Sequence, residues 1–166
     1  MKVVHDVLSD SLHKKCSEAI KDFLPHQIWG SSNLFWGDDL VKGLGGSCLS
    51  TRLPRNLEYE IVEQIKHKLP PADRIILQFY VWQALSGIMW HNDEAHKFGA
   101  TIYLNENWNV NDGGIFLYQN SESNTLTGLT PKKNTMVIND QHEFHMVTPV
   151  SLNTNEPRLT LQIWGH

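Results

Sequence analysis

The second half of the chain is a series of short apolar segments, and this series limits the possible folds more than any other feature. The segments are rich in β-branched and aromatic residues, which favour strands, and turn-forming Asn, Asp, Gly and Pro separate them. They read RIILQFYVWQAL, ATIYLN, GIFLYQ, NTMVIN, HMVTPV and RLTLQIW. The series therefore predicts a mainly β protein, built as an antiparallel sheet pair or barrel.

Two amphipathic helices are predicted in the first half, where apolar residues recur at helical spacing. One spans Ser11–Leu24 and stops before Pro25, and the other spans Asn56–Leu69 and stops before Pro70. Residues 26–54 contain five glycines among aromatic residues, which predicts loops and short strands without fixing their positions. No linker divides the chain, so we expect one domain over 1–166, with helical support at about 9–70 and a β-core at about 72–166.

Composition excludes several classes of protein. The 14 basic and 18 acidic residues give a net charge of −4, without the basic patch that nucleic-acid binding needs. No stretch matches a signal peptide or a membrane span, which predicts a cytoplasmic protein with no membrane partner. Cys16 and Cys48 are too few for a disulfide framework and are expected to be reduced.

His91 and Asp93 are the first candidates for chemistry. In extended chain, residues two apart point to the same side, so the pair can present an imidazole and a carboxylate to one point. A third ligand must come from elsewhere, and His145 is preferred because it opens the apolar run HMVTPV. His142, in the polar turn NDQHEF, is the alternative. We expect His142 and His96 to face solvent if they are not ligands.

Two histidines and one carboxylate leave about three coordination positions open, as non-haem Fe(II) enzymes require, whereas zinc is the chemical competitor. Arg158 favours iron with a carboxylate co-substrate, because a planar guanidinium binds a carboxylate through two hydrogen bonds. It heads the strand RLTLQIW, where alternate residues share one face. That face is expected to be a ligand wall made by Arg158, Thr160, Gln162 and Trp164, with Tyr103 of ATIYLN adding a hydroxyl donor.

The order His91-x-Asp93, His145, Arg158 resembles the Fe(II)- and 2-oxoglutarate-dependent oxygenases, and the flanking words look like their prolyl 4-hydroxylase branch. These words are TIYLNENW, then Gly113-Gly114, then HMVTPV and RLTLQIW. The resemblance implies a double-stranded β-helix, a jelly-roll or cupin-like barrel with flanking helices. It also implies site roles: iron ligands at His91, Asp93 and His145, and co-substrate contacts at Arg158, Tyr103, Thr160 and Gln162.

The implied activity is hydroxylation of a C–H bond, most simply in a peptidyl proline. Fe(II), 2-oxoglutarate and O2 would take part, succinate and CO2 would be released, and ascorbate is a candidate reductant. Collagen-type relatives use lysine as the carboxylate partner, whereas this chain has Arg158, as the oxygen-sensing type does. The usual tyrosine and Pro-Gly turn before the first histidine are absent, so Tyr80 or Trp82 is expected to fill that wall. The gap from His145 to Arg158 is longer than usual and predicts an extended loop at SLNTNEP.

Three alternatives remain open from the sequence. The same chemistry could act on a free amino acid or another small molecule. A nucleobase substrate is disfavoured, because the second arginine of that branch is missing after Arg158. A jelly-roll module that binds without catalysis is the non-enzymatic alternative. Substrate contacts are expected from the loops at 26–54 and 119–131, with Trp90 as a candidate groove residue.

Overall fold

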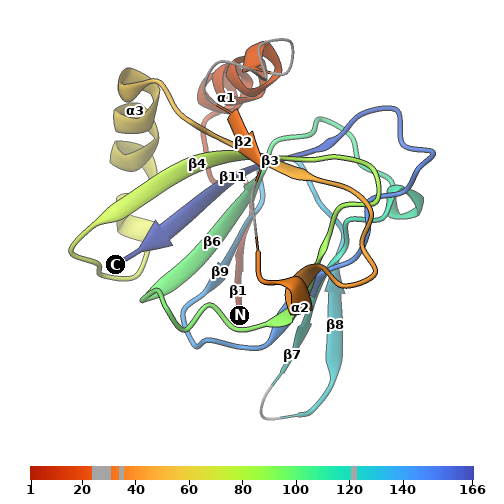
Figure 1. The fold of residues 1–166 in the computed structure, drawn as a ribbon. Coiled ribbons are helices and arrows are strands. Elements are labelled where there is room, and N and C mark those ends of the chain that lie inside the picture. Colours follow the sequence, from red (N-terminus) through yellow and green to blue (C-terminus); the bar gives the residue numbers. More distant parts are fainter. Residues whose placement is uncertain (24–30, 34–35, 121–122) are drawn as a thin grey trace.

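Two antiparallel sheets face each other, and two helices cover the outer side of the larger sheet (Figure 1). The computed structural model describes residues 1–23, 31–33, 36–120 and 123–166. Within them the large sheet has the order β1-β9-β6-β11-β4-β3-β2, and the small sheet has the order β5-β10-β7-β8. This is the double-stranded β-helix that the sequence led us to expect.

The first four strands all belong to the large sheet, and from β4 onward the chain passes back and forth between the two sheets. The large sheet contains β1 (Lys2–Val4), β2 (Ser31–Asn33), β3 (Cys48–Arg52), β4 (Ile75–Trp82), β6 (Phe98–Tyr103), β9 (Met136–Asn139) and β11 (Arg158–Gly165). The small sheet contains β5 (Ile88–His91), β7 (Phe116–Gln119), β8 (Leu126–Leu129) and β10 (His145–Val147). The helices are α1 (Asp10–Phe23), α2 (Asp38–Val41) and α3 (Arg55–Ile65), with short 3-10 turns at Lys66–Lys68 and Val110–Asp112.

Helix α1 confirms the first predicted helix. The Ser9 hydroxyl accepts a hydrogen bond from the Leu12 amide at its start, as a capping residue does. Leu12, Cys16 and Ile20 lie on one face and are buried. The predicted end at Leu24 and Pro25 lies outside the described residues.

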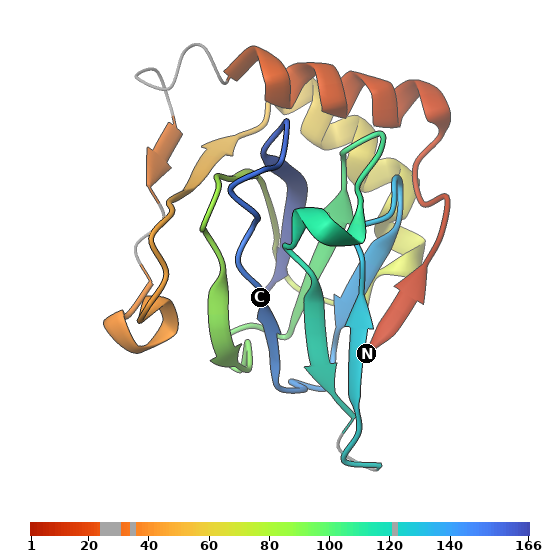
Figure 2. The same ribbon diagram turned by 90° about the vertical axis from the view of Figure 1, so that its right-hand side faces the viewer.

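Helix α3 confirms the second predicted helix over most of its length. Leu57, Ile61 and Ile65 are buried at helical spacing, and the last predicted turn tightens into the 3-10 turn at Lys66–Lys68. Helices α1 and α3 lie beside each other against the same face of the large sheet (Figure 2). They leave the other face of that sheet to the small sheet and the site.

Strand β11 divides its side chains between two cores, as its alternation predicts. Leu159, Leu161 and Ile163 belong to the apolar cluster that packs under the helices. Arg158 and Gln162 are instead on the inner face and line a pocket between the sheets. Strand β6 divides its side chains in the same way, so every second residue of the central strands is available for function.

The region 26–54 could not be assigned from sequence, and its described part extends the large sheet. Strand β2 pairs with β3, and β3 pairs with β4, while α2 follows at the pocket side. Cys16 and Cys48 are free and buried, as expected. Burial raises the pKa of Cys16 to about 12, which keeps this thiol protonated and unreactive. Within the described residues no helix has the length and apolarity to cross a membrane.

Candidate metal centre

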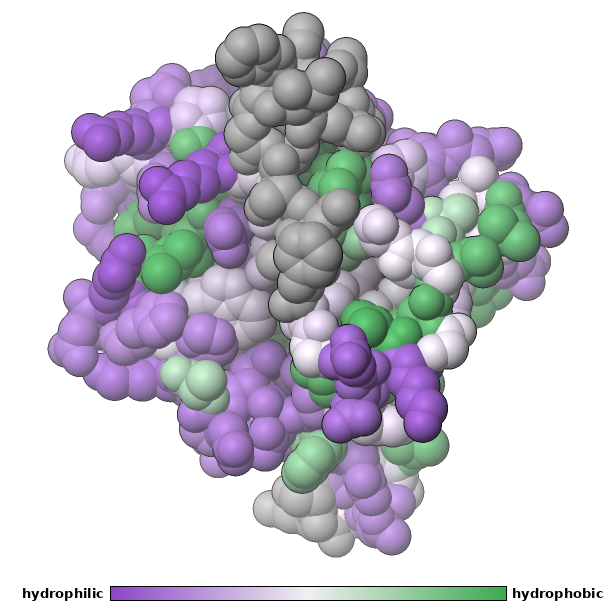
Figure 3. Space-filling view, viewed as in Figure 1, coloured by the Kyte–Doolittle hydropathy of each residue, from purple (hydrophilic) through white to green (hydrophobic). Residues whose placement is uncertain are grey.

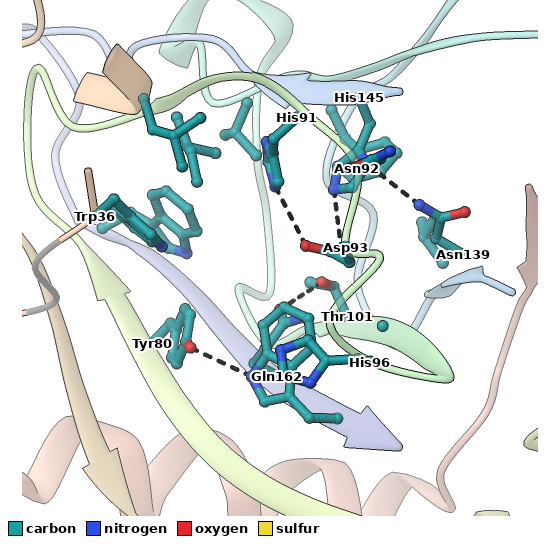
Figure 4. Close-up of a pocket in the computed structure, with 18 of the residues that line it drawn as sticks. Trp36, Tyr80, His91, Asn92, Asp93, His96, Thr101, Asn139, His145 and Gln162 are labelled. Atoms are coloured by element: carbon teal, nitrogen blue, oxygen red, sulfur yellow. Dashed lines mark hydrogen bonds and ion pairs between the residues drawn. The ribbon is translucent and has the colours of Figure 1, made fainter. Parts of the chain in front are cut away.

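His91 and His145 are brought together by strand pairing. They are directly opposite each other on β5 and β10, and their ring centroids lie 4.2 Å apart. Asp93 follows β5 and turns its carboxylate between the two rings, with Oδ1 3.4 Å from His91 Nε2 and Oδ2 3.3 Å from His145 Nε2 (Figure 4). One ligand atom from each residue lies within 4.8 Å of the others. Three ligand atoms of the predicted types therefore converge on one point.

Backbone carbonyls orient both imidazoles. His91 Nδ1 lies 2.7 Å from the Met89 carbonyl, and His145 Nδ1 lies 3.0 Å from the Glu143 carbonyl. A carbonyl only accepts hydrogen bonds, so each Nδ1 must carry the hydrogen. In the neutral imidazole Nε2 then holds the lone pair that a metal ion would take, and Nε2 is the atom that faces Asp93. This arrangement is common in metal sites, where the second ring nitrogen fixes the tautomer.

The electrostatics of the cluster suit a cation. Burial opposes ionisation of Asp93, but hydrogen bonds and charge from His145 and His91 outweigh it and hold the pKa of Asp93 well below its usual range. Burial likewise disfavours charge on His91, while Asp93 and the Met89 carbonyl more than compensate and raise the pKa of His91. An anionic carboxylate thus lies in a largely enclosed place, which a divalent metal would neutralise.

Asn139 was not recognised from the sequence, although it supports His145. Its side-chain amide donates to the Glu143 carbonyl at 3.0 Å, and its oxygen accepts from the Glu143 amide at 3.0 Å. The same carbonyl receives the His145 Nδ1 hydrogen. Asn139 therefore fixes the backbone turn that orients a candidate ligand, and we treat it as a positioning residue.

Replacing Asn139 with alanine is expected to lower Fe(II) affinity by about 10- to 100-fold, the range typical of lost supporting contacts in metal sites. Competition with a metal-binding dye would measure this affinity. Asn153→Ala is the matched control, because Asn153 is exposed in the 151–157 loop. Equal affinity in Asn139→Ala and wild type would show that the Glu143 carbonyl stays in place without the amide.

The cluster opens into a pocket of about 440 Å³ between the sheets. One wall is aromatic: Trp36 stacks on Trp82 with ring centroids 5.4 Å apart, and the Tyr80 hydroxyl accepts a hydrogen bond from Trp164 Nε1. Tyr80 and Trp82 both line the pocket, so both of the expected substitutes for the missing tyrosine are present. Trp36 comes from the region that sequence could not assign.

Arg158 is buried at the inner end of this pocket. It is 1% exposed, and its guanidinium carbon lies 5.1 Å from the Trp82 ring centre and 5.2 Å from that of Tyr103. Arg158 Nε and Nη1 and the Tyr103 hydroxyl have no hydrogen-bond partner among the described residues. Burial lowers the pKa of Arg158 and raises that of Tyr103. Three buried donors thus lack an acceptor, which is what an incoming carboxylate would supply.

Thr160 and Gln162 follow Arg158 on the same face but differ in role. The Thr160 hydroxyl accepts from Trp82 Nε1 at 3.1 Å, so its own hydrogen is left to donate. It is fully buried and is not among the pocket-lining residues. Gln162 does line the pocket, and its Oε1 accepts from the Thr101 hydroxyl at 2.6 Å. Whether either contacts a co-substrate stays a prediction.

Gly114 makes room for Arg158. A Cβ at this position would lie 2.7 Å from Arg158 Cδ, and the backbone has φ of +59°, a region that L-residues rarely adopt. The preceding 3-10 turn is held by a capping box between Asn109 and Asp112. The loop SLNTNEP is a loop in the structure.

We expect Gly114→Ala to destabilise the protein by roughly 1–3 kcal/mol, through strain at positive φ and displacement of Arg158. Urea unfolding monitored by tryptophan fluorescence would measure the loss. Gly37→Ala is the control, because Gly37 has φ of −55° and nothing lies within 4 Å of a Cβ there. Equal losses in the two variants would contradict a specific requirement at Gly114.

The expectation that His96 and His142 face solvent was wrong. His96 lines the pocket and packs on Trp164 with centroids 4.3 Å apart. His142 is half-buried, and its Nε2 lies 2.9 Å from the His96 carbonyl, outside the three-residue cluster. His142 therefore anchors the 93–96 turn, and the structure favours His145 as the third residue. Trp90 is 37% exposed and is not among the residues that line the pocket.

Gly99 on β6 is a further residue that sequence reasoning missed. A Cβ there would lie 2.8 Å from the Asp93 carboxylate and 3.0 Å from the Trp164 ring. Asp93 reaches the two histidines because β6 has no side chain at this point. A glycine within a strand can mark such a close approach, but the sequence does not reveal which group approaches.

A jelly roll with two histidines and one carboxylate at the edge of a pocket is typical of non-haem metalloenzymes. The sequence places the chain within that class. Residues 77–166, more than half of the chain, match the family model of the 2OG-Fe(II) oxygenase superfamily, and the chain belongs to this family. The family implies Fe(II) as the bound metal, with 2-oxoglutarate and O2 as co-substrates. No curated protein matches the chain in sequence.

Solved structures with the same fold include a prolyl-4-hydroxylase from Pseudomonas putida, with a TM-score of 0.73 and 14% identity over 99% of this chain and 91% of that one. A prolyl hydroxylase from Trichoplax adhaerens, in complex with a peptide fragment of the hypoxia inducible factor oxygen degradation domain, has a TM-score of 0.71 and 14% identity over 99% and 82%. An α-ketoglutarate-dependent epimerase from nogalamycin biosynthesis has a TM-score of 0.68 and 13% identity over 98% and 76%. At this identity the likeness shows the fold, and the fold is shared by several chemistries.

Proposed function

We propose that this protein is an Fe(II)- and 2-oxoglutarate-dependent dioxygenase that hydroxylates a C–H bond of a peptide, most simply at a proline. His91, Asp93 and His145 would hold the iron. The observation that carries the proposal is the pairing of this cluster with a buried, unsatisfied guanidinium in one pocket. A zinc hydrolase has no general need of the second feature, whereas a dicarboxylate co-substrate needs both.

The residues present fit the metal and the co-substrate. Two neutral imidazoles and one carboxylate are the ligand set of non-haem iron oxygenases. With Nδ1 bonded to backbone carbonyls, each Nε2 would be the metal-binding atom of its imidazole. Arg158 offers the planar donor pair that suits a carboxylate. Tyr103 and Thr160 would add hydroxyl donors to the same carboxylate.

When bound, the iron with its co-substrate and O2 supplies an oxidant that replaces a substrate C–H bond with C–OH. The protein's part is to bind and orient. Arg158 would hold the distal carboxylate of 2-oxoglutarate, and Asp93 and the two histidines would hold the metal. Apolar side chains of Ile88 and Val147 line the pocket and would keep bulk water from the reacting groups.

Peptide as the substrate class rests on the likeness to prolyl hydroxylases, one of them solved with a peptide. Small molecules are the second candidate, because the nogalamycin epimerase has a comparable TM-score. Trp36 and Leu40 line the pocket and would contact either kind of substrate. Residues 36–41 belong to the 26–54 region that we expected to contact substrate.

The direct test is conversion of 2-oxoglutarate to succinate by purified protein, measured with and without Fe(II) and O2. Hydroxylation would then be sought by mass spectrometry in a proline-containing peptide library, with free proline and other free amino acids in parallel. We expect Fe(II)-dependent succinate formation that peptides stimulate more than free amino acids. Stimulation by free amino acids alone would support the second candidate. No Fe(II)-dependent binding of 2-oxoglutarate by calorimetry would instead favour a binding module without catalysis.

A further inference from the structure

A second pocket adjoins the metal pocket. It measures about 670 Å³, and the two pockets share His96 and Trp164 as lining residues. These rings pack against each other and form the partition between the two spaces. The second pocket continues along β4 to the start of α3, so it lies where a long substrate would leave the metal pocket.

The second pocket is strongly basic in an acidic protein. Three arginines line it, against one acidic residue, Glu58, although the whole chain carries a net charge of −4. The arginines are Arg52, Arg55 and Arg74, all exposed, and no ion pair joins any of them to another described residue. The space-filling view shows hydrophilic residues gathered on the side of α3 and β4 (Figure 3). Charge is therefore concentrated here without a partner.

Neighbouring acids do not neutralise this charge. Asp73, which precedes Arg74, is paired with Lys97. Glu58 makes no ion pair with the other described residues that line the pocket. The three guanidinium groups are thus available to an incoming anion, which each could bind through two hydrogen bonds.

The inner face of the large sheet connects the arginines to the metal pocket. Arg52 pairs with Gln78, Gln78 with Gln162, and Gln162 with Thr101, on four successive strands. Directly paired residues point to the same side of a sheet, so these four form one row. Thr101 and Gln162 line the metal pocket. Three strand spacings of 4.7–4.9 Å put Arg52 about 14 Å from the Thr101 end of this row.

We infer that the basic pocket is a specificity site, and that the substrate is a peptide with acidic side chains flanking the residue that is hydroxylated. The inference rests on the proposed function and adds a substrate class to it. An extended chain covers about 3.3 Å per residue, so a distance of about 14 Å places the acidic residues about four to six positions from the reacting one. Glutamines along the row, Gln78 and Gln162, offer amide groups that suit a peptide backbone.

A nucleic-acid strand is the competing anion and fits less well. Protein contacts to nucleic acid usually neutralise many phosphates at once, whereas this pocket offers three arginines in a protein of net negative charge. Apolar side chains, including Leu53 and Ile76, alternate with the charges along the pocket. A pocket lined by both apolar and cationic side chains suits a peptide, because the arginines can bind its acidic side chains while the apolar residues contact the rest of the chain.

The test is fluorescence anisotropy with labelled peptides, performed anaerobically with Fe(II) and 2-oxoglutarate present so that no turnover occurs. One peptide set carries a glutamate triplet about four to six positions from a proline, on either side, and a second set carries glutamine in its place. We expect wild type to bind one glutamate peptide about tenfold more tightly than its glutamine counterpart at low salt, with the preference falling as salt rises. The triple variant Arg52→Gln/Arg55→Gln/Arg74→Gln should lose the preference.

A matched triple variant, Lys2→Gln/Lys14→Gln/Lys132→Gln, removes the same charge from exposed positions outside the pocket and should keep the preference. Equal binding of the two peptide sets by wild type, or loss of the preference in both triple variants, would overturn the inference. Tighter binding of an oligonucleotide of equal charge would replace it with a nucleic-acid substrate. Succinate formed from 2-oxoglutarate without peptide is measured alongside, since its persistence in the arginine variant separates failure here from failure of the proposed function.

Discussion

Asp93→Ala is expected to reduce Fe(II)-dependent succinate formation by at least about a hundredfold. Loss of a supporting residue alone costs about 10- to 100-fold in metal affinity, and Asp93 is the only anionic group in the three-residue cluster. Without Asp93, only the two neutral imidazoles remain as ligands. The divalent cation then loses a negatively charged partner and one of its three protein ligands. Succinate release and Fe(II) affinity would both be measured, and both should fall.

Asp22→Ala is the matched control, because Asp22 is an exposed carboxylate near the end of α1 and its loss should change neither quantity. A second readout needs no metal. Asp93 raises the pKa of His91, so the imidazole of His91 in Asp93→Ala should titrate at lower pH than in wild type, as followed by NMR. Wild-type succinate formation in Asp93→Ala would exclude Asp93 as a ligand, and an unchanged titration of His91 would show that the two side chains do not interact.

The main part of the fold could be predicted because each central strand has one apolar face and one face with polar side chains. In β11 the apolar face packs under helices while the other face carries Arg158, Thr160 and Gln162. This division is local to the sequence, since side chains alternate with a period of two. It is therefore visible before any partner strand is known, and Arg158 and Gln162 of the predicted face do line the pocket.

The missed strands show where local patterns fail. Strand β5 is four residues long and β8 begins and ends with half-exposed or exposed residues, so neither has the apolar alternation that identifies β11. Strand β5 nevertheless places His91 opposite His145. The two ligand candidates could be chosen from the sequence, but their contact depends on a pairing between strands about fifty residues apart, which no local pattern records.

Supporting residues are hidden for a different reason. Asn139 is an asparagine at the end of a strand, and asparagine there ordinarily indicates a turn. Its buried hydrogen bonds to Glu143 exist only because the chain folds back within the 140–143 turn. His96 was similarly misassigned, since its packing on Trp164 joins the turn before β6 to strand β11. The roles of such residues follow from tertiary contacts and have no signature in the sequence alone.

The second large effect concerns substitution of Arg158, which should lower the affinity for 2-oxoglutarate without lowering the free energy of unfolding. Arg158→Met is expected to lower 2-oxoglutarate affinity by about a hundredfold or more, because charge-assisted hydrogen bonds contribute about 1.5–3 kcal/mol each. Arg158→Lys keeps the charge and loses the planar pair of donors, so an intermediate loss is expected. Isothermal calorimetry with the Fe(II) protein under nitrogen would measure all three affinities.

Without co-substrate, Arg158→Met should leave the free energy of unfolding unchanged or raise it. Methionine loses the contacts of the guanidinium with the Trp82 and Tyr103 rings, worth about 0.5–2 kcal/mol each. It also removes a buried cation whose Nε and Nη1 have no described partner, and each unsatisfied buried donor costs about 1–3 kcal/mol. The gain from removing the unsatisfied donors equals or exceeds the loss of the ring contacts. Replacing a buried ion with an apolar residue of similar volume is often neutral or stabilising for the same reason.

Thermal unfolding with and without 2-oxoglutarate distinguishes a ligand-binding arginine from a structural one. A co-substrate at a hundredfold excess over its Kd adds about 2.7 kcal/mol to the wild type and should add almost nothing to Arg158→Met. A loss of stability above about 2 kcal/mol in Arg158→Met without co-substrate would instead mean that the guanidinium supports the fold. In that case the three unsatisfied donors at Arg158 and Tyr103 would cease to be evidence for a carboxylate, and the iron cluster alone would carry the proposed chemistry.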